Sequence, residues 1–161
     1  MNGTGQTANG RRISMPWALA AIVMTVFIWA NSTVPGEGSS ALSQGVVAAV
    51  RAALAAMGLP SAWVTNFVVR KCGHFLEYAL LGVLVSQALD PEHELRRRAL
   101  PVIVLVLVLV PSIDECIQLF IPGRSGQLTD VLLDICGAAT GVVLRTIVVH
   151  RKKRRRAAPE G

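Results

Sequence analysis

Long apolar segments recur along this chain, separated by short polar connections. The apolar segments are residues 13–31, 66–89, 99–120 and 128–149. Each is close to the roughly 20 residues that an α-helix needs to cross about 30 Å of hydrocarbon. The pattern predicts an all-α, polytopic membrane protein with four transmembrane helices.

The first apolar segment has a second interpretation. A secretory signal peptide also places basic residues, here Arg11 and Arg12, before an apolar core, and residues 30–32 (ANS) form a loose cleavage site. Three further apolar segments follow, which favours an uncleaved helix.

Residues 41–59 carry apolar side chains at helical spacing, with Gln44 and Arg51 on another face. This pattern is typical of an amphipathic helix at the membrane interface, and the Pro-, Gly- and Ser-containing residues 32–40 before it predict a loop. A fifth span is the alternative, but it would place Arg51 near mid-bilayer, which is costly. We therefore expect an extracellular interfacial helix between the first two transmembrane helices.

Composition supports a membrane protein. Hydrophobic residues make up 52% of the chain and charged residues 16%, whereas soluble domains have roughly 25% charged residues. The net charge of +6 comes from short basic runs that flank the apolar segments, as topology signals do. No nucleic-acid-binding motif accompanies them, so a nucleic-acid partner is not expected. Cys72, Cys116 and Cys136 lie in apolar segments without metal-site spacing, which favours small buried residues.

The basic residues also predict orientation. With four spans, one side holds Arg11, Arg12, Arg96–Arg98, Arg145 and the run 151–156, and the other holds Arg51, Arg70, Lys71 and Arg124. Cytoplasmic loops carry the excess of Lys and Arg, so both termini are expected in the cytoplasm. The expected division is a disordered cytoplasmic N-terminus (1–12), a membrane domain (13–150) and a basic cytoplasmic tail (151–161) that attracts anionic lipid.

Three of the predicted spans contain ionisable residues, which are costly in a bilayer and are functional by default. Apart from Arg145, near the cytoplasmic end of the last span, these residues lie in the outer half of their span, and those within a span share a helical stripe. We take this set, with the adjacent loop arginine, as a candidate binding site at the outer leaflet: Lys71, His74, Glu77, Tyr78, Asp114, Glu115, Gln118, Arg124, Asp130 and Asp134. Gly137 and Gly141 continue the stripe of the two aspartates as a small-residue motif for helix packing.

The chemistry of this set leaves several readings open. Five acids oppose Arg70, Lys71 and Arg124, with His74 able to titrate, so salt bridges alone do not balance the charges. An internal network that holds the helices together is one interpretation. No cofactor is predicted, but a divalent cation has candidate ligands, and Arg124 can bind a phosphate or carboxylate. The candidate metal ligands are His74, Glu77, Asp114, Asp130 and Asp134.

Three segments resemble the signatures of VanZ-like membrane proteins. They are residues 71–82 (KCGHFLEYALLG), 114–124 (DECIQLFIPGR) and 129–138 (TDVLLDICGA), and they occur in the family's order. One departure is Asp134, where the pattern usually has Asn. The resemblance implies a protein of the bacterial inner membrane. The family's namesake is associated with resistance to the glycopeptide teicoplanin, so the resemblance also implies a cell-envelope role.

Three functions are compatible with these residues. A binding protein would use the outer pocket for a lipid, a lipid-linked cell-wall intermediate or an amphiphilic antibiotic. A membrane enzyme would act on a lipid-linked substrate, but no nucleophile motif supports it, so a non-enzymatic role is favoured. A small transporter would need polar residues through both halves of the membrane, and residues 81–89 and 102–110 are nearly all apolar.

Overall fold

We analysed a computed structural model, which describes residues 13–91 and 95–157. Within these residues the chain forms five α-helices and no strand: α1 (Met15–Ser32), α2 (Gly36–Ala56), α3 (Asn66–Leu89), α4 (Leu100–Gln118) and α5 (Leu128–Ala157). The all-α prediction is therefore confirmed over this part of the chain. The N-terminal segment 1–12, predicted to be disordered, lies outside the described residues, as do residues 158–161 of the tail.

Local sequence explains most helix boundaries. Pro16 and Pro101 lie in the first turns of α1 and α4, where proline costs no helical hydrogen bond. Thr65 caps α3, because its hydroxyl accepts a hydrogen bond from the Val68 amide at 3.2 Å. α5 runs past the predicted span and includes the basic residues 151–156.

The predicted loop over residues 32–40 is wrong for its second half. Residues 36–40 form the first turns of α2, and the helix ends at Ala56, before the predicted end at residue 59. Pro35 occupies the N-cap position, and Glu37 lies in the first turn, where a negative charge complements the helix dipole. The Gly36 amide donates to the Pro122 carbonyl at 3.1 Å. This tertiary contact stabilises the start of α2, although the local sequence favours a turn there.

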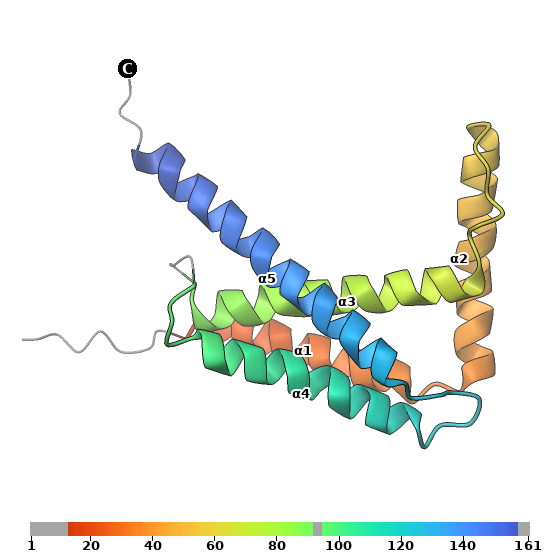
Figure 1. Ribbon diagram of the computed structural model, residues 1–161, viewed down its shortest axis with the longest axis horizontal. Helices are drawn as coiled ribbons and strands as arrows, with labels where there is room; N and C mark the ends of the chain where they lie inside the picture. The colour runs from red at the N-terminus through yellow and green to blue at the C-terminus, as the bar shows by residue number, and fades with distance from the viewer. Residues whose placement is uncertain (1–12, 92–94, 158–161) are drawn as a thin grey trace, which may run out of the picture.

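The helices form a bundle with one transverse element (Figure 1). α1, α3 and α4 run alongside one another, and α5 crosses α3 obliquely. α3 is central, because it packs against each of the other four helices, most extensively against α5. α2 lies across the end where α1 and α4 finish and α3 and α5 begin. We call this end of the bundle the α2 end.

Many large apolar side chains of this protein lie on its surface, and several charged side chains lie inside, unlike in a typical soluble protein. All five helices are long and apolar enough to span a membrane. Large apolar side chains such as Phe27, Leu105 and Leu144 are exposed, whereas Asp114 and Asp134 are fully buried. Apolar surface on the outside with ionisable groups inside is what a lipid environment selects. Together with the length of the helices, it indicates a membrane protein. The three cysteines, expected to be small buried residues, are exposed instead.

The end of the bundle opposite α2 has polar contacts of its own. The Arg145 side chain is buried, and its Nε donates to Oε1 of Gln87 at 2.8 Å. The same guanidinium donates to the Asp90 carbonyl. Arg145, which the sequence suggested only as a topology signal, therefore also ties α5 to the end of α3.

Candidate functional site

The structure gathers the predicted site residues at the α2 end of the bundle. α3 contributes Lys71, His74, Glu77 and Tyr78, α4 contributes Asp114, Glu115 and Gln118, the following loop contributes Arg124, and α5 contributes Asp130 and Asp134. We call this set the polar cluster. It is not one uniform network, because its members divide into groups with different partners.

The first group is an ion pair between two helices. Lys71 Nζ contacts Asp130 Oδ1, joining α3 to the first turn of α5. The ammonium also lies 5.3 Å from the centre of the Phe67 ring, within the range of a cation–π contact. The side chains remain 27% and 19% exposed, respectively, so this pair lies at the rim of the cluster.

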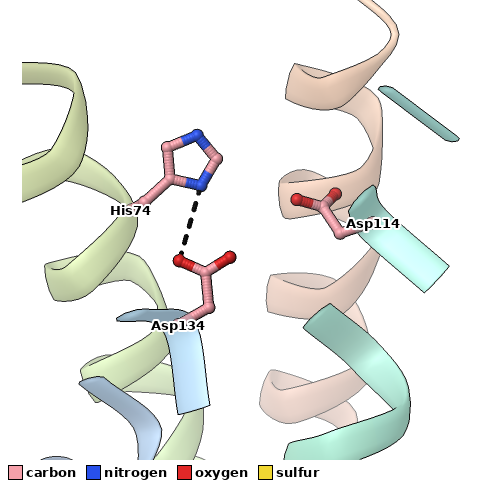
Figure 2. Close-up of side chains that lie close together, drawn as sticks. All are labelled: His74, Asp114 and Asp134. Carbon is pink, nitrogen blue, oxygen red and sulfur yellow. Dashed lines mark ion pairs between the residues drawn. The ribbon is translucent and has the colours of Figure 1, made fainter. Parts of the chain in front are cut away.

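The second group is buried and incompletely paired. Nδ1 of His74 lies 3.8 Å from Oδ1 of Asp134, and Asp114 faces the same space from α4 (Figure 2). One potential ligand atom from each of these three residues lies within 4.8 Å of the other two. Asp114 and Asp134 are fully buried. Within the part of the chain that the structure describes, His74 Nδ1, Asp114 Oδ1 and both Asp134 oxygens have no hydrogen-bond partner.

A short chain of hydrogen bonds orients Asp114. Gln118, one turn further along α4, donates to Asp114 Oδ2 at 3.2 Å and to the Ser32 hydroxyl at 3.3 Å. All three side chains are buried. The buried Tyr78 hydroxyl lies beside Asp114 without a hydrogen bond of normal geometry. The second carboxylate oxygen of Asp114 is thereby fixed, while the first stays available.

The remaining members stabilise the loops at this end. Glu115 Oε2 accepts from the Gln127 amide at 2.9 Å. Arg124 donates from Nε to the Val34 carbonyl at 2.9 Å and from Nη2 to the Asn31 carbonyl at 2.8 Å. Partial burial lowers the pKa of the Arg124 guanidinium, which nevertheless stays charged at physiological pH. Since two of its donors are already used, Arg124 has less capacity for a phosphate than the sequence suggested.

Glu77 is connected to α1. Its Oε1 accepts a hydrogen bond from Asn31 Nδ2 at 3.4 Å. Asn31 therefore contacts two members of the polar cluster, because its carbonyl also accepts from Arg124. Glu77, the candidate metal ligand with this separate partner, lies apart from the group formed by His74, Asp114 and Asp134.

Comparison with known protein families shows which family this chain belongs to. Residues 17–149 match the VanZ/LLP1 family. The chain belongs to the VanZ/LLP1 family. No curated protein and no solved structure shows a significant match. The family match covers α1 to α4 and the membrane-length part of α5, so it includes every residue of the polar cluster.

Two cavities open beside the polar cluster of this VanZ/LLP1 protein. One, of about 260 Å³, lies between the end of α1, α2 and α3, and combines Arg70, His74 and Glu77 with the apolar Leu42 and Val46. The other, of about 270 Å³, lies between α3, α5 and the loop before α5, and its lining is mainly polar, including Gln118, Gln127 and Asp130. Arg70 and His74 line both cavities.

Close helix packing brings the two aspartates of α5 to α3. A Cβ atom at Gly137 would lie 2.5 Å from the Phe75 carbonyl oxygen, and one at Gly141 would overlap the Ala79 carbonyl. Neither backbone can yield, so α3 and α5 approach this closely only with glycine at both positions. Gly82 of α3 makes the reciprocal approach to Ala138.

Several residues of the VanZ/LLP1 site were not in the predicted set. Asn31 and Ser32 had been assigned to the end of a span and a loop, and Arg70 had only been counted as a charge. Gln127 had not been singled out. The sequence signal that could have identified Asn31 and Ser32 is their position. They are the first consecutive polar residues after a long apolar segment, and they stand at the same end of the predicted spans as the acids.

Proposed function

We propose that this VanZ/LLP1 protein spans the bacterial inner membrane four times, through α1, α3, α4 and α5, with both termini in the cytoplasm. α2 then lies along the outer surface. In support, α2 runs across the bundle (Figure 1), buries only Gly36, and has the least apolar membrane-length stretch of the five helices. The basic run 151–156 lies at the opposite end, where it can contact anionic lipid.

In this arrangement the polar cluster faces the outer leaflet, and we propose that it binds the anionic head group of an amphiphile. The cavity beneath α2 supports this, because its walls differ in character. Leu42, Val46 and Val69 provide an apolar side, while Arg70 and His74 provide a polar side. A ligand with a hydrocarbon chain and a phosphate-bearing head group matches both.

The main support for the proposal is the side chain of Arg70, which is unpaired among the described residues. It lines both cavities, and within residues 13–91 and 95–157 no hydrogen bond or ion pair engages its guanidinium. The other bases are occupied, since Lys71 is paired with Asp130 and Arg124 binds two backbone carbonyls. An arginine held in a membrane protein without a partner is suited to bind a phosphate through two parallel hydrogen bonds.

A head-group site on this leaflet fits a role in the cell envelope. Lipid-linked cell-wall intermediates are phosphate-bearing amphiphiles, and binding them would alter their availability to glycopeptides of the teicoplanin type. Resistance is therefore one consequence that the proposal accommodates. An enzyme acting on a lipid-linked substrate is the second candidate, favoured by the half-buried His74, which lines both cavities and lies 3.8 Å from the buried Asp134.

Photolabelling in lipid nanodiscs tests the head-group site. The probe is a photoactivatable polyprenyl diphosphate, with photoactivatable phosphatidylglycerol as the comparison. We expect label in residues 39–46 and 69–77, and a loss of about tenfold in labelling for Arg70→Gln, as for a charged hydrogen bond. Arg51→Gln is the matched control, because Arg51 lines neither cavity.

The result that contradicts the proposal is label confined to the lipid-facing surfaces of α1 and α4, or equal effects of the two arginine variants. Turnover of the polyprenyl diphosphate by the purified protein would instead establish the enzyme candidate.

A further inference from the structure

The polar cluster retains a buried acidic core after all its visible partners are assigned. Asp130 is paired with Lys71, Glu77 with Asn31, and Glu115 with the Gln127 amide. Asp114 and Asp134 are both fully buried, lie on different helices and face His74. Within the described residues, Asp114 accepts one hydrogen bond, from Gln118, and its Oδ1 has no partner. The buried Glu115 also has an oxygen, Oε1, without a partner in this part of the chain, but it is not in the group of potential ligands formed by these three residues. Across the described residues, the only ion-pair contact of Asp114 or Asp134 is the long one between Asp134 and His74.

Two carboxylates in this position need compensation. A buried ionised carboxylate is strongly unfavourable unless it is paired, shares a proton or coordinates a metal. Lys71 and Arg124 are engaged elsewhere. Arg70 lies nearby, but within the described residues no ion pair joins it to Asp114 or Asp134. A divalent ion would balance the two negative charges and leave His74 neutral, which is the form of imidazole that binds metals.

We propose that His74 Nδ1, Asp114 Oδ1 and Asp134 form a binding site for a divalent transition-metal ion. Imidazole with carboxylate ligands suits Zn²⁺ and Mn²⁺ better than Ca²⁺, which prefers oxygen alone. Of the five candidate ligands in the sequence, the structure selects three, because Glu77 and Asp130 have other partners.

The separations of the ligand atoms agree with such a site. Ligand atoms about 2.1 Å from one ion are at most about 4.2 Å apart. One potential ligand atom from each residue lies within 4.8 Å of the other two, and His74 Nδ1 lies 3.8 Å from Asp134 Oδ1. Figure 2 shows the two carboxylates and the imidazole converging on one space. In a tetrahedral site the ligand atoms are about 3.4 Å apart, so the widest separation must shorten by up to about 1.4 Å when an ion binds.

The surroundings include the supporting contacts that metal sites use. Gln118 holds Oδ2 of Asp114 and leaves Oδ1 free, which is how outer-shell partners orient a metal ligand. The unpartnered Tyr78 hydroxyl lies beside the same carboxylate and can donate to it or complete the coordination. His74 lines both cavities, so an ion has an entry path.

The metal site can be tested independently of amphiphile binding, because the test uses the metal alone. The full chain is purified in detergent, treated with EDTA and dialysed, and then titrated with Co²⁺ under optical absorption. We expect one Co²⁺ per chain, with visible bands that Zn²⁺ abolishes by displacement. We expect each of three variants to weaken Co²⁺ binding by at least about tenfold: Asp114→Asn, Asp134→Asn and His74→Gln.

Glu77→Gln is the matched control, since it removes one acid of the same cluster that is not in the ligand set. We expect it to change Co²⁺ affinity by less than threefold. Circular dichroism and gel filtration before titration verify that each variant is folded. Any of three results would overturn the site. They are full Co²⁺ occupancy in Asp134→Asn, no stoichiometric Co²⁺ binding by the folded wild type, and a loss of Co²⁺ affinity in Glu77→Gln as large as in the ligand variants. Absence of Co²⁺ together with a proton shared by Asp114 and Asp134, detected by infrared carboxyl bands, would replace it with a proton-sharing pair.

Discussion

Lys71 on α3 forms an ion pair with Asp130 in the first turn of α5, although 59 residues separate them in the chain. The contact lies at the rim of the polar cluster, beside the cavity that both residues line. It neutralises Asp130 and so separates that acid from the buried group of His74, Asp114 and Asp134. The pair therefore decides which acids remain available for a ligand.

Breaking this pair is expected to destabilise the protein moderately. Lys71→Met or Asp130→Asn leaves one partly buried charge without its partner, and we expect a loss of about 1–2 kcal/mol, between the values for exposed and buried pairs. In the double variant the two losses should not add, with a coupling of about 1 kcal/mol. Unfolding by SDS in mixed micelles, followed by circular dichroism, measures all three. Simple additivity would show that the pair contributes nothing.

Gly141→Ala is expected to separate α3 from α5. The new Cβ would overlap the Ala79 carbonyl of α3, and overpacking against a backbone that cannot yield costs about 1–3 kcal/mol. Thermal unfolding in detergent measures the loss. Gly45→Ala on α2 is the control, because nothing lies within 4 Å of its Cβ position. Replacing this helical glycine should be neutral or stabilising by up to about 1 kcal/mol, and equal effects at both positions would refute close packing as the cause.

Arg124→Lys is expected to loosen the connection between α1 and α2. An ammonium cannot reproduce the fork by which Arg124 binds the carbonyls of Val34 and Asn31. Hydrogen exchange measured by mass spectrometry should therefore accelerate in residues 33–39, including the Gly36 amide that donates to Pro122. Exchange in residues 81–88 of α3, far from this loop, serves as the internal reference. Unchanged exchange in 33–39 would show that the arginine fork is dispensable.

Arg145→Met should weaken the end of the bundle opposite α2. It removes the donors to Gln87 and to the Asp90 carbonyl while keeping the length of the side chain. Leaving the buried Asp90 carbonyl and the half-buried Gln87 amide oxygen without these donors costs about 1–3 kcal/mol. Arg151→Met, an exposed change on the same helix, is the control and should leave the thermal midpoint within about 1 °C, as surface substitutions do. A similar shift for both variants would contradict the buried role of Arg145.

The orientation of α2 has a direct test. In a cysteine-free background, Ser39→Cys near the start of α2 and Met57→Cys just after its end are labelled in intact cells with a membrane-impermeant maleimide. An interfacial helix on the outer surface predicts that both react from outside. Reaction of only one of them from outside would show that α2 spans the membrane and that five helices cross it.

The positions of the helices follow from the sequence, because membrane-length apolar segments have few alternatives. The predicted span 66–89 coincides with α3, and the other three spans differ from their helices mainly at the ends. The end of the bundle at which the ionisable residues gather follows for the same reason, since it depends only on where each residue stands in its helix. The start of α2 could not be predicted in this way, because Gly36 is stabilised by Pro122 and lies against Gly123 in a distant loop.

The sequence by itself determined that acids and bases from three helices meet at one end of the bundle, because helical period and span length place them there. Only the tertiary structure decided which of them are paired. Lys71 reaches Asp130, Arg124 turns to backbone carbonyls, and Glu115 accepts the Gln127 amide, each choice depending on distances of a few ångströms between segments far apart in the chain. What those pairings leave unsatisfied is the group of His74, Asp114 and Asp134, which composition and spacing alone could not distinguish from its neighbours.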